Sequence, residues 1–168
     1  RTSEVSSTPL EGKPILTGPE RVRPYGLLEA IRQLAGDFSR DGVQVGVRTY
    51  EYVLMRFDTE AVMKSGNEMT IEQDIYRIVQ EALNNAIKHA HAHEILVLLD
   101  GSESKHLCLS ISDDGVGFVP GSGEQSQAGG FGMKTMRERA ETLGGSLRVL
   151  SAPGRGATIE VMIPYAGA

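Results

Sequence analysis

Hydrophobic residues recur every three or four positions in three parts of the chain, which is the period of an amphipathic helix. The first part covers 26–40 and ends before an Asp-Gly pair that commonly stops a helix. The second begins at Thr70, which forms a capping-box pattern with Gln73, and extends to about residue 90. The third covers 131–143 and ends at two glycines. The pattern therefore predicts three helices.

Alternation of apolar and polar residues predicts strands between and after these helices. The predicted strands are 43–48, 52–57, 94–99, 106–112, 147–151 and 157–163. Because hairpin-connected strands accompany the helices, a doubly wound parallel sheet does not fit. We predict an α+β fold, a two-layer sandwich in which a mixed, mostly antiparallel sheet packs on about three helices.

Two segments show neither the helical period nor the alternation of a strand. Residues 1–24 are rich in Ser, Thr, Gly and Pro, and we expect a linker or N-terminal arm there, followed by one domain over 25–168. Residues 119–130 are dense in Gly, Ser and Gln, which predicts a mobile loop.

Charge and composition narrow the classes of partner. The 168 residues carry 17 Lys and Arg against 22 Asp and Glu, and this net charge of -5 argues against nucleic acid as a partner. The longest apolar run, 95–99, is far shorter than a membrane span, so we expect no membrane contact by this chain. Its first residue is Arg1, which favours a cytoplasmic piece of a longer protein whose parent could be anchored in a bacterial inner membrane.

Three polar residues, Glu81, Asn85 and Lys88, share one face of the second predicted helix because they stand at i, i+4 and i+7. A carboxylate, an amide oxygen and an ammonium in line could hold Mg²⁺ and the phosphates that it bridges. Taken alone, these residues are better explained by a solvated helix face with one weak ion pair.

Glycine pairs mark the places where loops join strands or helices. The pairs are Gly115/Gly117, Gly130/Gly132 and Gly154/Gly156. Glycine lets a ligand approach the backbone closely, and the N–H groups at a helix start could face phosphate oxygens. Asp113 follows a predicted strand, where it could accept a hydrogen bond from a ligand or simply begin a turn. Neither a P-loop nor a dinucleotide fingerprint is present.

The segments QEALNNAIKHA, DDGVGF, GGFGMKTMRERAETLGG and GRGATIEVMIP occur in this order along the chain. Together they resemble the ATP-binding catalytic domain of two-component sensor histidine kinases, of the nitrate-sensor type. That domain belongs to an ATPase superfamily shared with gyrase, heat-shock chaperones and mismatch-repair proteins. The resemblance covers about 25–164 and implies the Bergerat-type ATP-binding fold.

The resemblance implies roles for residues of the second helix and the loop after it. Asn85 would ligate Mg²⁺, Glu81 would lie beside the γ-phosphate as a base, and Lys88 would approach the phosphates. His89 would lie near the nucleotide in a binding role. Asp113 would accept a hydrogen bond from the adenine amino group and so select ATP.

The remaining ATP-binding positions implied by the resemblance lie in the glycine-rich segments. They are Gly115, Gly117, Gly130, Phe131, Gly132, Met133 and Thr158. The first two would admit the base, and Gly130 and Gly132 would cradle phosphates under a lid formed by 119–129. The family commonly has Thr directly after the last glycine pair, where this chain has Ala157, with Thr158 next.

The resemblance also implies a function. ATP and Mg²⁺ would be the cofactors, and the γ-phosphoryl group would pass to a histidine in a separate dimerisation domain and then to a response regulator. No such acceptor histidine precedes the domain in this chain, and we expect this chain alone to be a monomer. The alternatives are a stand-alone serine kinase of the anti-sigma-factor type and an ATP-sensing module without transfer activity.

Overall fold

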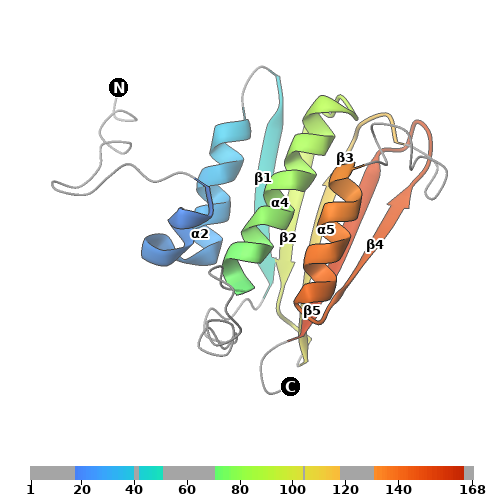
Figure 1. The fold of residues 1–168 in the computed structure, drawn as a ribbon. Helices are drawn as coiled ribbons and strands as arrows, with labels where there is room; N and C mark the ends of the chain where they lie inside the picture. Colours follow the sequence, from blue (N-terminus) through green and yellow to red (C-terminus); the bar gives the residue numbers. More distant parts are fainter. Residues whose placement is uncertain (1–17, 40–41, 51–70, 104, 118–130, 165–168) are drawn as a thin grey trace, which may run out of the picture.

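The computed structural model describes residues 18–39, 42–50, 71–103, 105–117 and 131–164 (Figure 1). The helical elements are the 3₁₀ helix η1 (Gly18–Arg21) and the helices α2 (Val22–Phe38), α4 (Ile71–Lys88) and α5 (Phe131–Thr142). The strands are β1 (Gln44–Tyr50), β2 (Glu94–Asp100), β3 (His106–Asp113), β4 (Ser146–Ser151) and β5 (Ala157–Pro164).

The five strands form one sheet in the order β1-β2-β3-β5-β4. β1 runs parallel to β2, and the other neighbouring strands pair in antiparallel fashion. The helices α2, α4 and α5 lie on the same side of this sheet (Figure 1). The predicted fold class, an α+β two-layer sandwich with a mixed, mostly antiparallel sheet, is confirmed.

The core lies between the helices and the inner face of the sheet. Leu107, Leu109 and Ile111 of β3 are buried, whereas the residues between them are partly exposed, because successive strand residues face opposite sides. Helix α4 contributes Ile78 and Val79, both fully buried, to the same hydrophobic cluster. The apolar periods in the sequence therefore mark the surfaces that meet in the core.

Helical structure begins at Gly18, inside the segment that the sequence assigns to a linker ahead of 25–168. Val22 and Arg21 are only 5% and 9% exposed, so this segment packs against the domain. Gly26 interrupts the helical dihedrals of α2 with a φ of 81°, a conformation that glycine adopts without strain. This kink breaks the apolar period, which explains why the sequence predicts a helix that starts only at residue 26.

A long-range hydrogen bond ties η1 to the start of α4. The side-chain Nε2 of Gln73 donates to the carbonyl oxygen of Pro19 at 3.2 Å. Thr70 lies outside the described residues, so its capping box with Gln73 stays a prediction. The predicted strand 52–57 and the predicted loop 119–130 also lie outside them.

The central position of β3 predicts which leucines support the fold. Replacing Leu109, which is fully buried, by alanine should lower the free energy of unfolding by about 2–5 kcal/mol, since it leaves a cavity in the core. The matched control is Leu96→Ala on the neighbouring strand, where the side chain is 36% exposed and the loss should be clearly smaller. Urea unfolding of the chain measures both values, and equal losses would contradict the assignment of the core.

Candidate functional site

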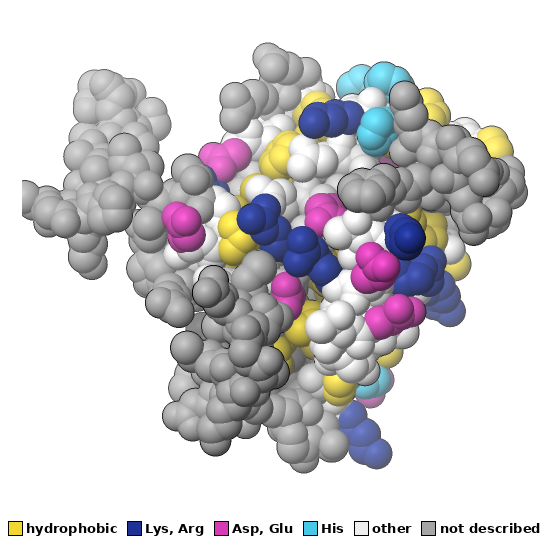
Figure 2. All heavy atoms as spheres, viewed as in Figure 1, with side chains coloured by type: hydrophobic (Ala, Val, Ile, Leu, Met, Phe, Trp, Pro, Cys, Tyr) yellow, Lys and Arg dark blue, Asp and Glu magenta, His cyan; other side chains and the backbone are white. Residues whose placement is uncertain are grey.

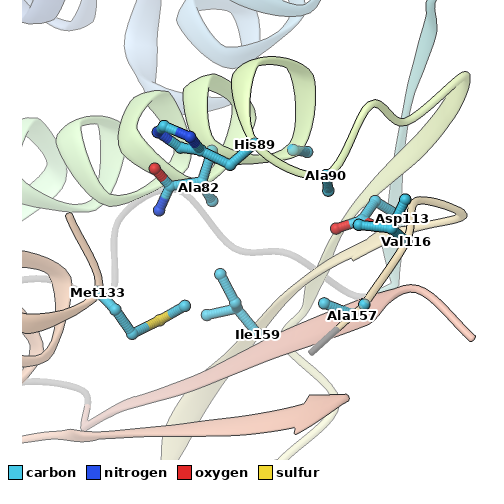
Figure 3. Close-up of a pocket in the computed structure, with 11 residues that line it drawn as sticks. Ala82, His89, Ala90, Asp113, Val116, Met133, Ala157 and Ile159 are labelled. Atoms are coloured by element: carbon cyan, nitrogen blue, oxygen red, sulfur yellow. The ribbon is translucent and has the colours of Figure 1, made fainter. Parts of the chain in front are cut away.

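A pocket opens between α4, the start of α5 and the ends of β3 and β5 that lie nearest to them (Figure 3). Its lining combines small apolar side chains with a few polar ones. The lining residues are Ala82, Asn85, Ala86, His89, Ala90, Asp113, Val116, Gly117, Met133, Ala157 and Ile159. Segments far apart in the sequence therefore meet around one space.

The walls of the pocket come from helix and sheet. Asn85 and His89 stand one helical turn apart, so both project from the same face of the helix that ends here. Figure 3 shows Met133 and Ile159 across the pocket from His89, with Asp113 toward one end. A flat apolar group could lie between these walls while its polar edge reaches Asp113.

Asp113 is the acidic group of the pocket. Its Oδ1 accepts a hydrogen bond from the backbone N–H of Gly115 at 2.8 Å. Burial raises the pKa of Asp113, although the backbone N–H groups of Gly115 and Ala157 oppose this by stabilising the carboxylate. In its ionised form this carboxylate only accepts hydrogen bonds, so it suits a ligand that donates one.

The neighbouring Asp114 has a structural role. Its Oδ1 accepts hydrogen bonds from the backbone N–H groups of His93 at 2.8 Å and Glu94 at 3.0 Å, which fixes the start of β2. These hydrogen bonds lower the pKa of Asp114, and the one from Glu94 has the largest effect. The pKa values of the adjacent Asp113 and Asp114 are thus shifted in opposite directions, because Asp113 faces a pocket whereas Asp114 accepts hydrogen bonds from backbone N–H groups at the surface.

Two glycines allow the chain to pack closely around the pocket. A Cβ atom at Gly115 would overlap the Ala90 carbonyl oxygen, and one at Gly117 would overlap the Ala152 carbonyl oxygen. Gly117 also has a φ of 69°, which disfavours other residues. The sequence suggests that Gly115 and Gly117 make room for a ligand, whereas in the structure this room is filled by the protein's own backbone.

The structure brings five of the residues singled out from the sequence to the pocket. They are Asn85, His89, Asp113, Gly117 and Met133. Gly130 lies outside the described residues, and so do the side-chain surroundings of Phe131 and Gly132 at the start of α5.

Glu81, Lys88 and Thr158 are not among the residues that line the pocket. Glu81 instead pairs with Arg139 of α5, at 3.3 Å between Oε1 and Nε, and Lys88 is exposed. The Thr158 hydroxyl lies 3.0 Å from that of Ser112. The structure therefore does not support Thr158 as a nucleotide contact, because the alternation along β5 turns it away from the pocket.

Sequence reasoning missed the small side chains of the pocket and the pairing of Arg139. Ala82, Ala86 and Ala90 recur at every fourth position and line the pocket. Ala157 faces the pocket at the position where the family commonly has Thr. The signal for these residues was the spacing of small residues, which also fits ordinary core packing.

The sequence model of a family described as "Histidine kinase-, DNA gyrase B-, and HSP90-like ATPase" matches residues 70–167, which include every residue of the pocket. The chain belongs to this ATPase family. The family resemblance drawn from the sequence motifs is therefore confirmed.

Curated relatives are sensor kinases. The oxygen sensor histidine kinase NreB of Staphylococcus carnosus is 33% identical over 147 residues, which cover 87% of this chain and 38% of NreB. The histidine-protein kinase/phosphatase UhpB of Salmonella typhimurium is 32% identical over 87% of this chain and 26% of UhpB. The sensor histidine kinase LiaS of Bacillus subtilis is 39% identical over 56% of this chain and 25% of LiaS. The chain thus spans well under half the length of these relatives.

Solved structures show the same fold. The ATP-binding domain of PrrB from Mycobacterium tuberculosis superposes with a TM-score of 0.61 at 20% identity, covering 84% of this chain and 93% of PrrB. Full-length ShkA in complex with AMPPNP gives a TM-score of 0.65 at 18% identity, covering 85% of this chain and 30% of ShkA. At these identities the likeness concerns the fold alone.

The two aspartates predict a titration experiment. We expect Asp113 to titrate above and Asp114 below the ordinary value of 3.8. Asp114 should stabilise the fold above its unfolded-state pKa, and this contribution should disappear as the pH falls through its lower folded-state pKa. The contribution of Asp113 to stability has the opposite pH dependence. It is present below the unfolded-state pKa and is lost as the pH rises through the raised folded-state pKa.

Carbon-detected NMR of the carboxyl groups in the free chain measures both titrations. Asp114→Asn should also lower the free energy of unfolding at neutral pH, and this difference from wild type should shrink as the pH falls through the lowered folded-state pKa of Asp114. Coincident titration curves for the two residues would contradict the different environments that the structure gives them.

Proposed function

We propose that this chain is the ATP-binding catalytic domain of a sensor histidine kinase. It binds Mg-ATP in the pocket and transfers the γ-phosphoryl group to a histidine of a separate helical dimerisation domain, from which a response regulator receives it. The observation that carries the proposal is the convergence of Asn85, His89, Asp113 and Met133 on one pocket within the family match. The names of the relatives, all sensor histidine kinases or sensor proteins, favour this function over a serine kinase or a module without transfer activity.

The adenine ring enters between the apolar walls of the pocket. Met133 and Ile159 contact one face of the ring, and the small side chains of Ala82 and Ala86 leave room on the side of α4. Asp113 accepts a hydrogen bond from the adenine amino group. Guanine has an oxygen at that position, so a carboxylate there favours ATP over GTP.

The phosphates extend toward Asn85 and the start of α5. The first backbone N–H groups of a helix have no partner within the helix and attract phosphate oxygens, and α5 begins at Phe131. Gly130 and Gly132 flank this start, where they permit a close approach of the phosphates. His89, one turn from Asn85, lies beside the nucleotide, and Lys88 can reach outward to phosphate oxygens from the end of α4.

The residues of the pocket fit Mg²⁺ bound together with a nucleotide. No group of three His, Cys, Asp or Glu that could hold a metal alone occurs among the described residues. Mg²⁺ needs few protein ligands when phosphates and water supply the rest, and the amide oxygen of Asn85 is a suitable hard ligand. When bound, the ion neutralises negative charge on the phosphates.

The domain boundary and the location follow from the same proposal. We place the start of the domain at Gly18, since η1 and the buried Val22 pack on it, and we assign the residues before it to the connection with the dimerisation domain. No helix in the described part of the chain is long and apolar enough to cross a bilayer. We propose that the domain works in the cytoplasm, where ATP is available.

Asn85→Ala tests the transfer reaction. In the parent kinase with radiolabelled ATP and Mg²⁺ it should reduce labelling by about 100-fold or more, because it removes the metal ligand. Binding of metal-free nucleotide should persist, since the adenine contacts remain. Asn84→Ala is the matched control, because Asn84 is the adjacent residue of the same helix and does not line the pocket.

The chemical stability of the label identifies the acceptor. A phosphoryl group on histidine is lost in acid, whereas one on serine survives, so acid-stable labelling would support the serine kinase instead. An isolated chain that labels itself stoichiometrically would contradict a separate acceptor domain. Nucleotide binding without any labelling of the parent protein would support the module that only senses ATP.

Asp113→Asn tests adenine recognition. The asparagine can donate as well as accept, so the variant should lose affinity for ATP by about tenfold or more while its affinity for GTP changes less. Isothermal titration of the chain with both nucleotides measures this, and Asp114→Asn serves as the neighbouring control. Equal losses for ATP and GTP would indicate that Asp113 only shapes the turn.

A further inference from the structure

The contact between α4 and α5 joins the pocket to a cluster of charges. Arg139 of α5 places Nε at 3.3 Å from Oε1 of Glu81 and Nη1 at 3.3 Å from Oδ1 of Asp74. We call Asp74, Glu81 and Arg139 the seam cluster. Figure 2 shows basic and acidic side chains side by side on the face formed by the helices.

The helices α4 and α5 run side by side (Figure 1). Asn85 and Met133 line the pocket, whereas Asp74, Glu81 and Arg139 pair with one another elsewhere along these two helices. On α4, Glu81 stands one turn before Asn85, so both project from the same helix face. On α5, Met133 lines the pocket and Arg139 follows nearly two turns later. Helix α5 thus contributes Met133 of its first turn to the nucleotide pocket and Arg139 of its second half to the ion pair with Glu81.

One oxygen of the Glu81 carboxylate has no partner in the described structure. Its Oε2 is buried and makes no hydrogen bond there, while Oε1 is taken by Arg139. A buried carboxylate oxygen without a donor costs free energy, and such atoms are uncommon in folded proteins. Glu81 is therefore arranged to receive one more hydrogen-bond donor.

The Arg139 side chain is itself fixed from two sides. The side chain of Asp74 is only 8% exposed, and burial raises its pKa although the charge and hydrogen bond of Arg139 lower it. A planar guanidinium can direct separate N–H groups to two carboxylates, which an ammonium on a flexible stem does not do with the same geometry. Asp74 thus anchors the guanidinium that orients Glu81.

We propose that Arg139 is a positioning residue for Glu81 in phosphoryl transfer, an inference that rests on the proposed function. Arg139 holds Oε1, so that Oε2 accepts the N–H of the acceptor imidazole. The lone pair of the other ring nitrogen forms the bond to the γ-phosphorus. The bond from this phosphorus to the bridging oxygen breaks, its electron pair leaves with ADP, and the N–H proton passes to Glu81.

The test measures kcat and KM for ATP in the parent kinase. Arg139→Met should lower kcat about tenfold or more, while KM and the affinity for ADP change less than about twofold, because the pocket lining is intact. Glu81→Gln should lower kcat further. In the double variant the loss should equal that of Glu81→Gln alone, since Arg139 acts only through Glu81.

Arg137→Met is the matched control. Arg137 lies on the same helix, but its Nη1 donates to the carbonyl oxygen of Leu147 at 2.9 Å, away from Glu81, so its kcat should stay within about twofold of wild type. Thermal unfolding of each variant shows whether the fold is retained. If Arg139→Met does not fold, Arg139→Lys keeps the charge and should still show a several-fold lower kcat at unchanged ADP affinity.

Specific results would overturn the inference. These are a wild-type kcat in Arg139→Met or in Arg139→Lys, a loss in the double variant equal to the product of the single losses, or an effect confined to KM. Absence of transfer in the wild-type parent kinase would instead overturn the proposed function, so the two failures are distinguishable.

Discussion

The site depends on three places where backbone passes so close to backbone that no side chain fits between. Gly115 packs on the Ala90 carbonyl oxygen, Gly117 on that of Ala152, and Gly156 on that of Asp113. These contacts join the end of α4, the turn after β3 and the turn before β5. Since Asp113, Val116 and Ala157 of the pocket stand on or next to these segments, the shape of the pocket is set by glycine packing as much as by its own side chains.

The predictable part of the fold is the part in which burial repeats with a fixed period. The alternation through Leu107, Leu109 and Ile111 predicts β3, and the stripe through Ile75 and Ala82 predicts α4, because each element faces one core. The N-terminal part of α2 was not predictable in this way. Two helical stretches meet at Gly26, where glycine tolerates the positive φ of the kink, and no local period in the sequence indicates such a kink.

Contacts between distant residues account for what the sequence did not predict in the site. Glu81 and Arg139 are 58 positions apart, so nothing in the spacing of Glu81, Asn85 and Lys88 shows that the first would turn toward α5. On β5 the side chain that reaches the pocket belongs to Ala157 and not to Thr158, the next residue along the strand. The residues that flank Thr158 face the pocket and Thr158 itself faces the other side, since strand residues alternate strictly between faces.

Helix α5 connects these observations. Its first turn lies beside the pocket through Met133, and its second half ends in the seam cluster at Arg139. The buried Met136 and Ala140 hold the helix body in the core between these points. The first turn beside the pocket and the guanidinium that holds Glu81 therefore belong to one packed helix. Glu81 and Asn85 share one face of α4. The same pair of helices, α4 and α5, therefore positions both the carboxylate that Arg139 holds and the amide proposed to bind Mg²⁺ beside the phosphates.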